Sequence, residues 1–272
     1  MNRLAEIIDK RRLSLAAAKR AVSLDSLGAA MQVGRGRRPP HALRQAMANG
    51  EVINVIAEFK RRSPSKGIIK AGADARATAR QYELGGAAAI SVLTEPDYFE
   101  GSLDDLREVR EATPLPILRK DFVIDEYQVY ESAAAGADAL LLIVAALNDS
   151  ELTKLRQISE DELAMDAVVE VHTVDEMQRA VDCGARIIGV NNRNLATFEV
   201  SLDTSVELAR QAPPDTILIS ESGIETVNDI ERLHAAGYRG FLIGETLMRS
   251  ANPAALIGEL TQRVGTAAGP SK

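Results

Sequence analysis

Residues 136–143 read Gly-Ala-Asp-Ala-Leu-Leu-Leu-Ile, which is a glycine, small or polar residues and then an unbroken apolar run. The same order recurs in the segments that begin at Gly86, Gly184 and Gly237. Glycine can close a helix in the left-handed conformation. A continuous apolar run is typical of a parallel strand that is covered on both faces. Each segment therefore predicts a helix end followed by a buried parallel strand.

Further apolar runs raise the number of strand candidates to eight: Ile53–Phe59, Leu115–Leu118, Ala167–Val171 and Thr216–Ser220. The segments between them are long enough for crossover helices, so the chain has the pattern of an α/β protein. Eight βα units favour a closed (βα)8 barrel, the TIM barrel. An open, doubly wound sheet is the second choice, because it would need edge strands protected by charge, proline or shortness. None of the candidates is of that kind.

Composition agrees with one large barrel. The chain has 272 residues, of which 46% are apolar and 26% charged, with one cysteine and no tryptophan. Its 32 basic and 39 acidic side chains give a net charge of −7, which excludes a chain-wide attraction for nucleic acid or an anionic membrane. The start has no signal-peptide pattern, and no apolar run could span a bilayer. With Cys183 unable to form an internal disulfide, we expect a cytoplasmic protein.

The chain divides into three parts by composition. Residues 1–50 are rich in Ala, Lys, Arg and Leu, and apolar residues at helical spacing predict a helical extension packed on the barrel. Residues 51–264 form the predicted barrel, and residues 265–272 have the composition of a flexible tail. Within the extension, the basic stretch Arg35–Arg38 is expected to be a solvated loop, because it has no interleaved aromatic residues.

The chemistry of such a barrel stands at the carboxyl ends of its strands. Side chains alternate along a strand, so Glu58 and Lys60 share the inward face with Ile56. Other strand ends carry Arg119-Lys120-Asp121, Val169-Glu170-Val171-His172, Val190-Asn191-Asn192-Arg193 and Ser220-Glu221-Ser222-Gly223. Lysines and glutamates then converge as acid–base groups: crowded ammonium groups lower a lysine pKa, and nearby carboxylates raise it. For any one pair, a structural ion pair is the alternative.

The loops after the seventh and eighth strands carry Ser222-Gly223 and Gly244-Glu245. In TIM barrels a phosphate is commonly bound here by backbone N–H groups and a short extra helix. Asn252-Pro253 has the pattern of an N-cap and first-turn proline, so the last helix starts there and Glu245–Arg249 is the short extra helix. We expect the Glu245 side chain to point away from a phosphate dianion, with only its N–H contributing.

Other kinds of site lack their motifs. The three histidines are scattered without metal-ligand spacing, so no metal site is predicted. There is no Walker loop, and Gly34-Arg35-Gly36 lacks the third glycine and the preceding strand of a dinucleotide fingerprint. Cys183 is predicted at a helix end, away from any strand terminus, where it fills space.

The residues at the strand ends lie within an ordered set of motifs that spans residues 56 to 245. They are Ile56-Ala-Glu-Phe-Lys-Arg-Arg-Ser-Pro-Ser65, Ser91-Val-Leu-Thr-Glu-Pro96, Phe99-Glu-Gly-Ser102, Arg119-Lys-Asp-Phe122, Gly136-Ala-Asp138, Val169-Glu-Val-His172, Gly189-Val-Asn-Asn-Arg-Asn-Leu195, Glu221-Ser-Gly-Ile224 and Leu242-Ile-Gly-Glu245. This set resembles the indole-3-glycerol phosphate synthase family of tryptophan biosynthesis, in its stand-alone form. Pro40 departs from the family pattern, which often has an aromatic residue there.

The resemblance implies a substrate and a set of catalytic roles. The substrate would be 1-(2-carboxyphenylamino)-1-deoxyribulose 5-phosphate, converted to indole-3-glycerol phosphate with loss of carbon dioxide and water and without a cofactor. Lys120 would be the general acid for ring closure, and closure would precede decarboxylation because it creates the electron sink. Glu170, Glu58 and Lys60 would handle the later proton transfers, and Asn191 would orient substrate hydroxyls.

The resemblance also implies how the substrate is held. Its phosphate would lie on Ser222, Gly223, Gly244 and Glu245, with Lys60 nearby and Arg193 in support, and Ser222 would also count among the catalytic residues. The anthranilate ring would lie between apolar side chains: Leu93, Phe99, Phe122 and Leu141. The loop from Arg61 to Lys70 would close over the site, and the protein would be a monomer.

Two other functions stay open at this point. A sugar-phosphate isomerase, such as phosphoribosylanthranilate isomerase, would need a Cys and an Asp at the barrel mouth, and Cys183 is misplaced for that role. A barrel that binds a phosphorylated ligand without catalysis would not need both lysines and both glutamates.

Overall fold

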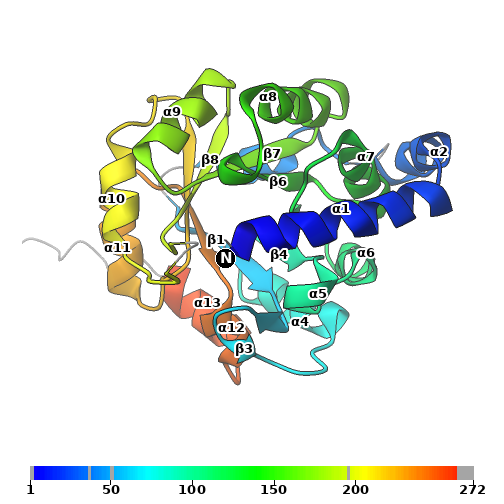
Figure 1. Cartoon of the computed structure of the whole chain (residues 1–272). Coiled ribbons are helices and arrows are strands. Elements are labelled where there is room, and N and C mark those ends of the chain that lie inside the picture. The colour runs from blue at the N-terminus through cyan, green and yellow to red at the C-terminus, as the bar shows by residue number, and fades with distance from the viewer. Residues whose placement is uncertain (1–2, 36–37, 50–51, 195–196, 262–272) are drawn as a thin grey trace, which may run out of the picture.

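The computed structural model describes residues 3–35, 38–49, 52–194 and 197–261. Eight parallel strands close into a barrel in the order β1-β10-β9-β8-β7-β6-β5-β4 (Figure 1). The closed barrel confirms the predicted fold and excludes the open sheet. The strands are β1 (Asn54–Phe59), β4 (Ala89–Leu93), β5 (Ile117–Lys120), β6 (Ala139–Ile143), β7 (Asp166–Val171), β8 (Ile187–Asn191), β9 (Ile217–Glu221) and β10 (Gly240–Ile243).

Each barrel strand is followed by a helix that packs on the outside. These helices are α4 (Ala75–Leu84), α6 (Leu103–Ala112), α7 (Glu126–Ala135), α8 (Asp149–Gln157), α9 (Val174–Asp182), α10 (Asp203–Ala209), α11 (Val227–Ala235) and α13 (Pro253–Thr261). The four glycines of the repeated pattern all have positive φ, between 79° and 103°, as the predicted helix ends require. At Gly136, for example, the single backbone N–H closes α7 by donating to Ala133 O and Ser132 O. The φ of 93° at this position would cost a residue with a Cβ more than it costs glycine.

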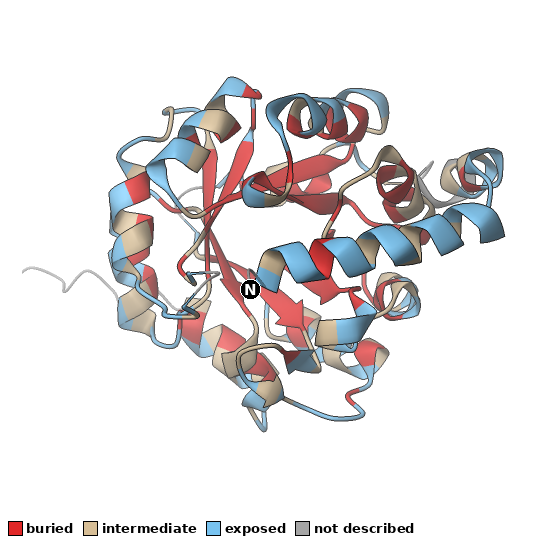
Figure 2. Cartoon of the chain, viewed as in Figure 1, coloured by how far each residue is buried: buried red, intermediate tan, exposed pale blue. Residues whose placement is uncertain are grey.

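The alternation along β1 shows how the strands sort their side chains. Val55, Ala57 and Phe59 pack outward in the apolar layer beneath the helices, and Ile56 packs inward with the barrel core. The inward and outward layers are both buried, which is why whole strands appear buried in Figure 2. Glu58 continues the inward series and is only 3% exposed. The alternation along β1 therefore places the Glu58 carboxylate in the barrel interior, at the carboxyl end of the strand.

Several short elements lie at the carboxyl end of the barrel. They are the hairpin β2 (Arg62–Ser63) and β3 (Gly67–Ile68), α5 (Pro96–Phe99), the 3-10 turn η1 (Val144–Ala146) and α12 (Glu245–Arg249). The π-helical turn η2 (Ile158–Glu162) instead extends α8. The bounds of α12 and the start of α13 at Pro253 confirm the prediction of a short extra helix before the last one.

The segment before β1 is helical, with α1 (Arg3–Ala21), α2 (Leu24–Arg35) and α3 (Ala42–Ala46). Helix α1 crosses the barrel face and α2 lies beside α7 (Figure 1). The sequence predicts a solvated loop at Arg35–Arg38, but the Arg38 side chain is bound to the barrel. Its Nε and Nη2 donate to the two carboxylate oxygens of Asp138, each at 2.8 Å. The division at residues 1–50, 51–264 and 265–272 stays a prediction, and the tail lies outside the described residues.

Candidate active site

A cavity of about 1030 Å³ opens at the carboxyl ends of the barrel strands. Its lining includes every residue that the sequence nominated: Glu58, Lys60, Leu93, Phe99, Lys120, Phe122, Leu141, Glu170, Asn191, Arg193, Ser222, Gly223, Gly244 and Glu245. These residues come from all eight barrel strands or the loops that follow them. The fold therefore brings the nominated side chains to one place. Arg3, Leu4 and Ile7 add a wall from α1 that sequence analysis did not nominate.

Lys120 forms the centre of the site. Its Nζ donates to Glu170 Oε2 at 3.0 Å and to Glu221 Oε2 at 2.8 Å. The lysine side chain is 13% exposed, and the two carboxylates are nearly inaccessible. A buried ammonium between two carboxylates is held in one orientation, with one face turned to the cavity.

The charges in this cluster set its protonation states. Burial alone would lower the pKa of Lys120, but Glu170, Glu221 and Glu58 outweigh burial and raise it. Of the two opposing effects expected for a crowded lysine, the effect of the carboxylates therefore dominates at Lys120. Burial, with help from Glu170 and Glu58, raises the pKa of Glu221 to about 7 against the opposing effect of Lys120.

Glu170 behaves in the opposite way to Glu221. Burial would raise its pKa, but Lys120, His172 and a hydrogen bond from Asn191 together lower it. One carboxylate of the cluster thus stays ionised while the other exchanges its proton near neutral pH. Two carboxylates whose pKa values are pushed apart can serve as different partners in proton transfer.

A second lysine lies beside the first cluster. Lys60, which directly follows β1, donates from Nζ to Glu58 Oε1 at the end of that strand. Gly244, at the end of β10, makes room for this pair, because a Cβ at this position would clash with the Glu58 carboxylate and crowd Lys60 Nζ. The loop nominated for phosphate binding therefore lies directly against the Glu58–Lys60 pair.

The nominated phosphate loop has unusual backbone geometry. Ser222 has φ of 69° and Gly223 has φ of 80°. Asn192 holds this turn, since its Nδ2 donates to Ser222 O at 3.1 Å and to Ser220 Oγ at 3.0 Å. A strained residue at a cavity wall persists only when its surroundings fix it. Asn192 supplies that support beneath the Ser222 hydroxyl.

The Glu245 carboxylate is paired with two basic side chains. Its Oε1 accepts from Arg249 Nε at 3.0 Å and lies 3.8 Å from Lys66 Nζ. The carboxylate is thus neutralised by cations, and the first-turn N–H groups of α12 have no carbonyl partner within the helix. Arg193 adds a further cation to this wall and donates from Nη1 to Phe198 O at 3.2 Å.

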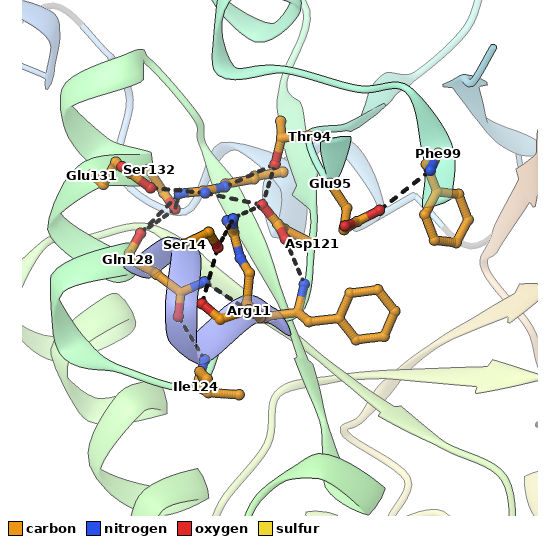
Figure 3. A network of polar contacts seen from close by, with 12 residues as sticks. Arg11, Ser14, Thr94, Glu95, Phe99, Asp121, Ile124, Gln128, Glu131 and Ser132 are labelled. Carbon is orange, nitrogen blue, oxygen red and sulfur yellow. Dashed lines mark hydrogen bonds and ion pairs between the residues drawn. The ribbon is translucent and has the colours of Figure 1, made fainter. Parts of the chain in front are cut away.

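The opposite wall is apolar. The rings of Phe99 and Phe122 lie 6.3 Å apart between centroids, at an interplanar angle of 42°. Glu95 fixes Phe99 by accepting from three N–H groups at the start of α5, and Asp121 fixes Phe122 by accepting from its N–H at 2.8 Å (Figure 3).

Asp121 belongs to a buried polar network behind β5. Its Oδ2 accepts from Arg11 Nη2 at 2.6 Å, from Arg119 Nη2 at 3.0 Å and from Thr94 Oγ1 at 2.5 Å (Figure 3). Arg119, which is fully buried, also donates to Ser132 Oγ at 3.0 Å. The network therefore joins α1, β5 and α7 directly behind Lys120.

Other candidate chemistries find little support. In the ranges that the structure describes, no three His, Cys, Asp or Glu side chains are grouped to hold a metal ion. Cys183 is buried at the C-cap of α9, as expected for a packing residue and remote from the strand ends that an isomerase would use. Among the helices of the described residues, none combines the length and apolar character needed to cross a membrane.

Three residues of the site, Glu221, His172 and Asn192, have no role predicted from the sequence. Glu221 ends β9, and its inward position follows from the alternation with Ile219. The spacing of the histidines marks His172 as isolated, although its place two residues after Glu170 puts both on one face. Asn192 points away from the cavity mouth, and no local sequence signal marked its contact with Ser222.

Comparisons with known proteins show the family of the chain. Residues 4–260 match the profile of the family described as indole-3-glycerol phosphate synthase. The chain belongs to the indole-3-glycerol phosphate synthase family. As a member of this family it is a carboxy-lyase of tryptophan biosynthesis.

Curated relatives match most of the chain. The indole-3-glycerol phosphate synthase of Koribacter versatilis is 46% identical over 94% of this chain and 98% of its own length. That of Desulfosudis oleivorans is 44% identical over 94% of this chain and 97% of its own length. The one from Lachnoclostridium phytofermentans is 50% identical over 76% of each chain.

Solved structures of other enzymes share the fold. The 3-hexulose-6-phosphate synthase of Salmonella typhimurium matches with a TM-score of 0.63 at 12% identity, over 77% of this chain and 97% of its own. Thiamine phosphate pyrophosphorylase from Pyrococcus furiosus matches with a TM-score of 0.58 at 15% identity, over 78% and 94%. At these identities the likeness concerns the barrel alone.

Proposed function

We propose that the chain carries out the family's reaction with Lys120 as its central acid. The substrate is 1-(2-carboxyphenylamino)-1-deoxyribulose 5-phosphate, and the products are indole-3-glycerol phosphate, carbon dioxide and water. One observation carries this assignment: the Lys120 ammonium, held between Glu170 and Glu221, lies between an apolar wall and a glycine-rich loop wall of one cavity. That order matches a substrate with an aromatic ring at one end and a phosphate at the other.

Binding uses the two walls. Phe99 and Phe122, with Leu93 and Leu141, form a slot for the anthranilate ring. Ser222, Gly223 and the first turn of α12 offer hydroxyl and N–H donors for the phosphate, next to Lys60 and Arg193. The hairpin β2–β3, whose Ser63, Pro64 and Ser65 line the cavity, is positioned to cover the substrate.

Ring closure is the first chemical step. The ring carbon that bears the carboxylate forms a bond to the substrate carbonyl carbon, and the carbonyl electron pair moves to oxygen. Lys120 donates its proton to that oxygen, and its charge stabilises the substrate carboxylate until then. Carbon dioxide then leaves, and the electrons of the broken bond restore the aromatic ring.

Dehydration completes the reaction. The new hydroxyl leaves as water with a proton from a general acid, and a base removes a proton from the carbon next to nitrogen. Glu170, Glu58 and Lys60 are the groups for these transfers, and Asn191 orients the substrate hydroxyls while it donates to Glu170. The residues themselves supply the donors and acceptors, so no cofactor is part of this proposal.

The direct test is indole fluorescence on mixing the purified protein with the substrate, in buffer with and without EDTA. The chain has no tryptophan, so the protein contributes little background. An indole signal that EDTA leaves unchanged is expected. A folded protein that binds the substrate without producing the signal would favour a ligand-binding barrel instead.

We also propose that the protein works as a cytoplasmic monomer. The site is complete within one chain, since all of its nominated residues line one cavity. Light scattering at assay concentration should give the mass of a single chain, and a stable dimer would contradict this part of the proposal.

A further inference from the structure

His172 lies between two carboxylates at the carboxyl end of β7. Its Nδ1 is 3.2 Å from Glu176 Oε2 on α9, and its Nε2 is 3.4 Å from Glu170 Oε1. The side chain is only 10% exposed. Nε2 is buried and has no hydrogen-bond partner among the described residues, so it faces the Glu170 carboxylate at slightly more than hydrogen-bond length.

Glu176 is itself fixed in place. It is in the first turn of α9, where its N–H donates to Thr173 Oγ1 at 3.2 Å. Its Oε2 also accepts from the backbone N–H of His172 at 2.7 Å. The imidazole is thus anchored from the helix side and presents Nε2 to the catalytic cluster.

The chemistry of the two partners determines the form of the imidazole. Ionised carboxylates only accept hydrogen bonds, and a neutral imidazole has one N–H. Such an imidazole would turn the lone pair of one nitrogen toward a carboxylate oxygen, whereas an imidazolium presents N–H to both. Glu221 on β9 adds further negative charge, and Lys120 on β5, which contacts the far oxygen of Glu170, opposes it. Burial favours the neutral ring, but these carboxylates outweigh it, so the pKa of His172 is raised.

We propose that His172, as an imidazolium anchored by Glu176, is a positioning residue that holds Glu170 ionised and oriented toward Lys120. Glu170 then has a cation at each oxygen, Lys120 at Oε2 and His172 at Oε1. The catalytic consequence rests on the proposed function, because it concerns the proton transfers of Glu170.

The test compares His172→Asn with His41→Asn. His41, the N-cap residue of α3, is the matched control: it lies beside the other end of β7, where its Nδ1 is 3.4 Å from Asp166 Oδ1. Asparagine cannot carry the charge that is proposed for His172. Loss of the imidazolium raises the pKa of Glu170, so the acid limb of kcat against pH should move upward by about half a unit to one unit in His172→Asn. Below that limb kcat should fall roughly three- to tenfold, with KM within about twofold, and His41→Asn should match the wild type.

A second readout does not need turnover. The chain has three histidines, so NMR titration of the imidazoles in the wild type and the two variants assigns each signal. His172 should titrate above its ordinary value of 6.5, and Glu176→Gln should lower that midpoint while the ring remains. If His172→Asn does not fold, Glu176→Gln carries the kinetic test in its place.

The outcomes separate the two proposals. A wild-type protein without turnover contradicts the proposed function, and the titration still decides the charge of His172. A His172 midpoint at or below 6.5, or a kcat profile that does not move in a folded His172→Asn, overturns the positioning role.

Discussion

Lys120 and Glu221 are in contact across the inside of the barrel, with 2.8 Å between Nζ and Oε2 and 101 positions between them in the chain. Their strands, β5 and β9, are not neighbours in the barrel order. The contact therefore exists only because the sheet closes. It places a carboxyl group with a pKa of about 7 directly against the ammonium that is proposed to start the reaction.

Replacing Lys120 with alanine should abolish detectable turnover in a folded protein. Loss of a general acid typically costs about 10²–10⁴-fold, and here the change also removes the cation from the ring-closure step. The measurement is kcat by indole fluorescence, with circular dichroism to verify the fold. Lys154→Ala is the matched control, because Lys154 forms an exposed pair with Glu126 and is 62% exposed. A folded Lys120→Ala variant near the wild-type rate would remove Lys120 from the mechanism.

Glu221 should make the protein less stable as the pH rises. Its folded pKa of about 7 lies above its ordinary value of 4.5, so the native state binds more protons between these values. The free energy of unfolding then falls with rising pH in this window. Glu170 acts in the opposite direction and only below its ordinary value, because its pKa is lowered.

The variant Glu221→Gln isolates this effect. The free energy of unfolding of the variant minus that of the wild type should increase between pH 4.5 and pH 6.5, by on the order of 1–2 kcal/mol. His172 contributes little to the slope there, since it is protonated in both states below 6.5. Urea unfolding at intervals across this range gives the free energy of unfolding of both proteins against pH. If that free energy changes with pH by the same amount in both, the raised pKa of Glu221 is contradicted.

Local patterns were enough to predict the strands and their inward residues. A glycine before an apolar run specifies where a strand begins, and the two-residue period then gives the direction of Glu58, Lys120 and Glu170. The protonation states of those groups could not be predicted from local patterns. The pKa of Lys120 depends on how many carboxylates face it across the barrel, and that number follows from closure and strand register. For the same reason the role of Glu221 and the contacts of His172 appeared only in the structure.

Gly189 makes room for Glu221, and alanine there should disturb the site. A Cβ at this inward position of β8 would clash with Glu221 Oε1 and come within 3.1 Å of Val168 Cγ1. We expect kcat to fall at least tenfold, and overpacking to cost about 1–3 kcal/mol of stability. Gly258→Ala, in α13 with open space around its Cβ, should instead be neutral or slightly stabilising. A Gly189→Ala enzyme with normal kcat would show that Glu221 can move without consequence.

Ser222 should affect substrate binding more than chemistry. Removing its hydroxyl takes away a phosphate contact that is equal in the ground and transition states, so KM should rise about threefold to thirtyfold while kcat changes little. Alanine keeps the strain of a residue at φ of 69°, whereas Ser222→Gly removes the hydroxyl and relieves the strain. Similar KM values in both variants would assign the effect to the hydroxyl. A loss confined to kcat would argue against a phosphate contact here.

Arg11 should anchor α1 more strongly than the surface pair on the same helix does. Its Nη2 lies 2.6 Å from Asp121 Oδ2, with the arginine side chain 13% exposed and the aspartate fully buried. Lys19 reaches Asp125 at 2.8 Å, but both side chains are substantially exposed. Exposed pairs contribute about 0–1 kcal/mol and weaken with salt, whereas loss of one member of a buried pair costs about 3–5 kcal/mol. Because Arg119 still neutralises Asp121 in the variant, Arg11→Ala should cost less than that, about 1–3 kcal/mol, and Lys19→Ala under 1 kcal/mol.

Urea unfolding at low and high salt distinguishes the two, since only the Lys19 effect should fade with salt. Equal losses that fade together would mean that α1 is held by its surface charges, and that the network behind Lys120 does not depend on the helix.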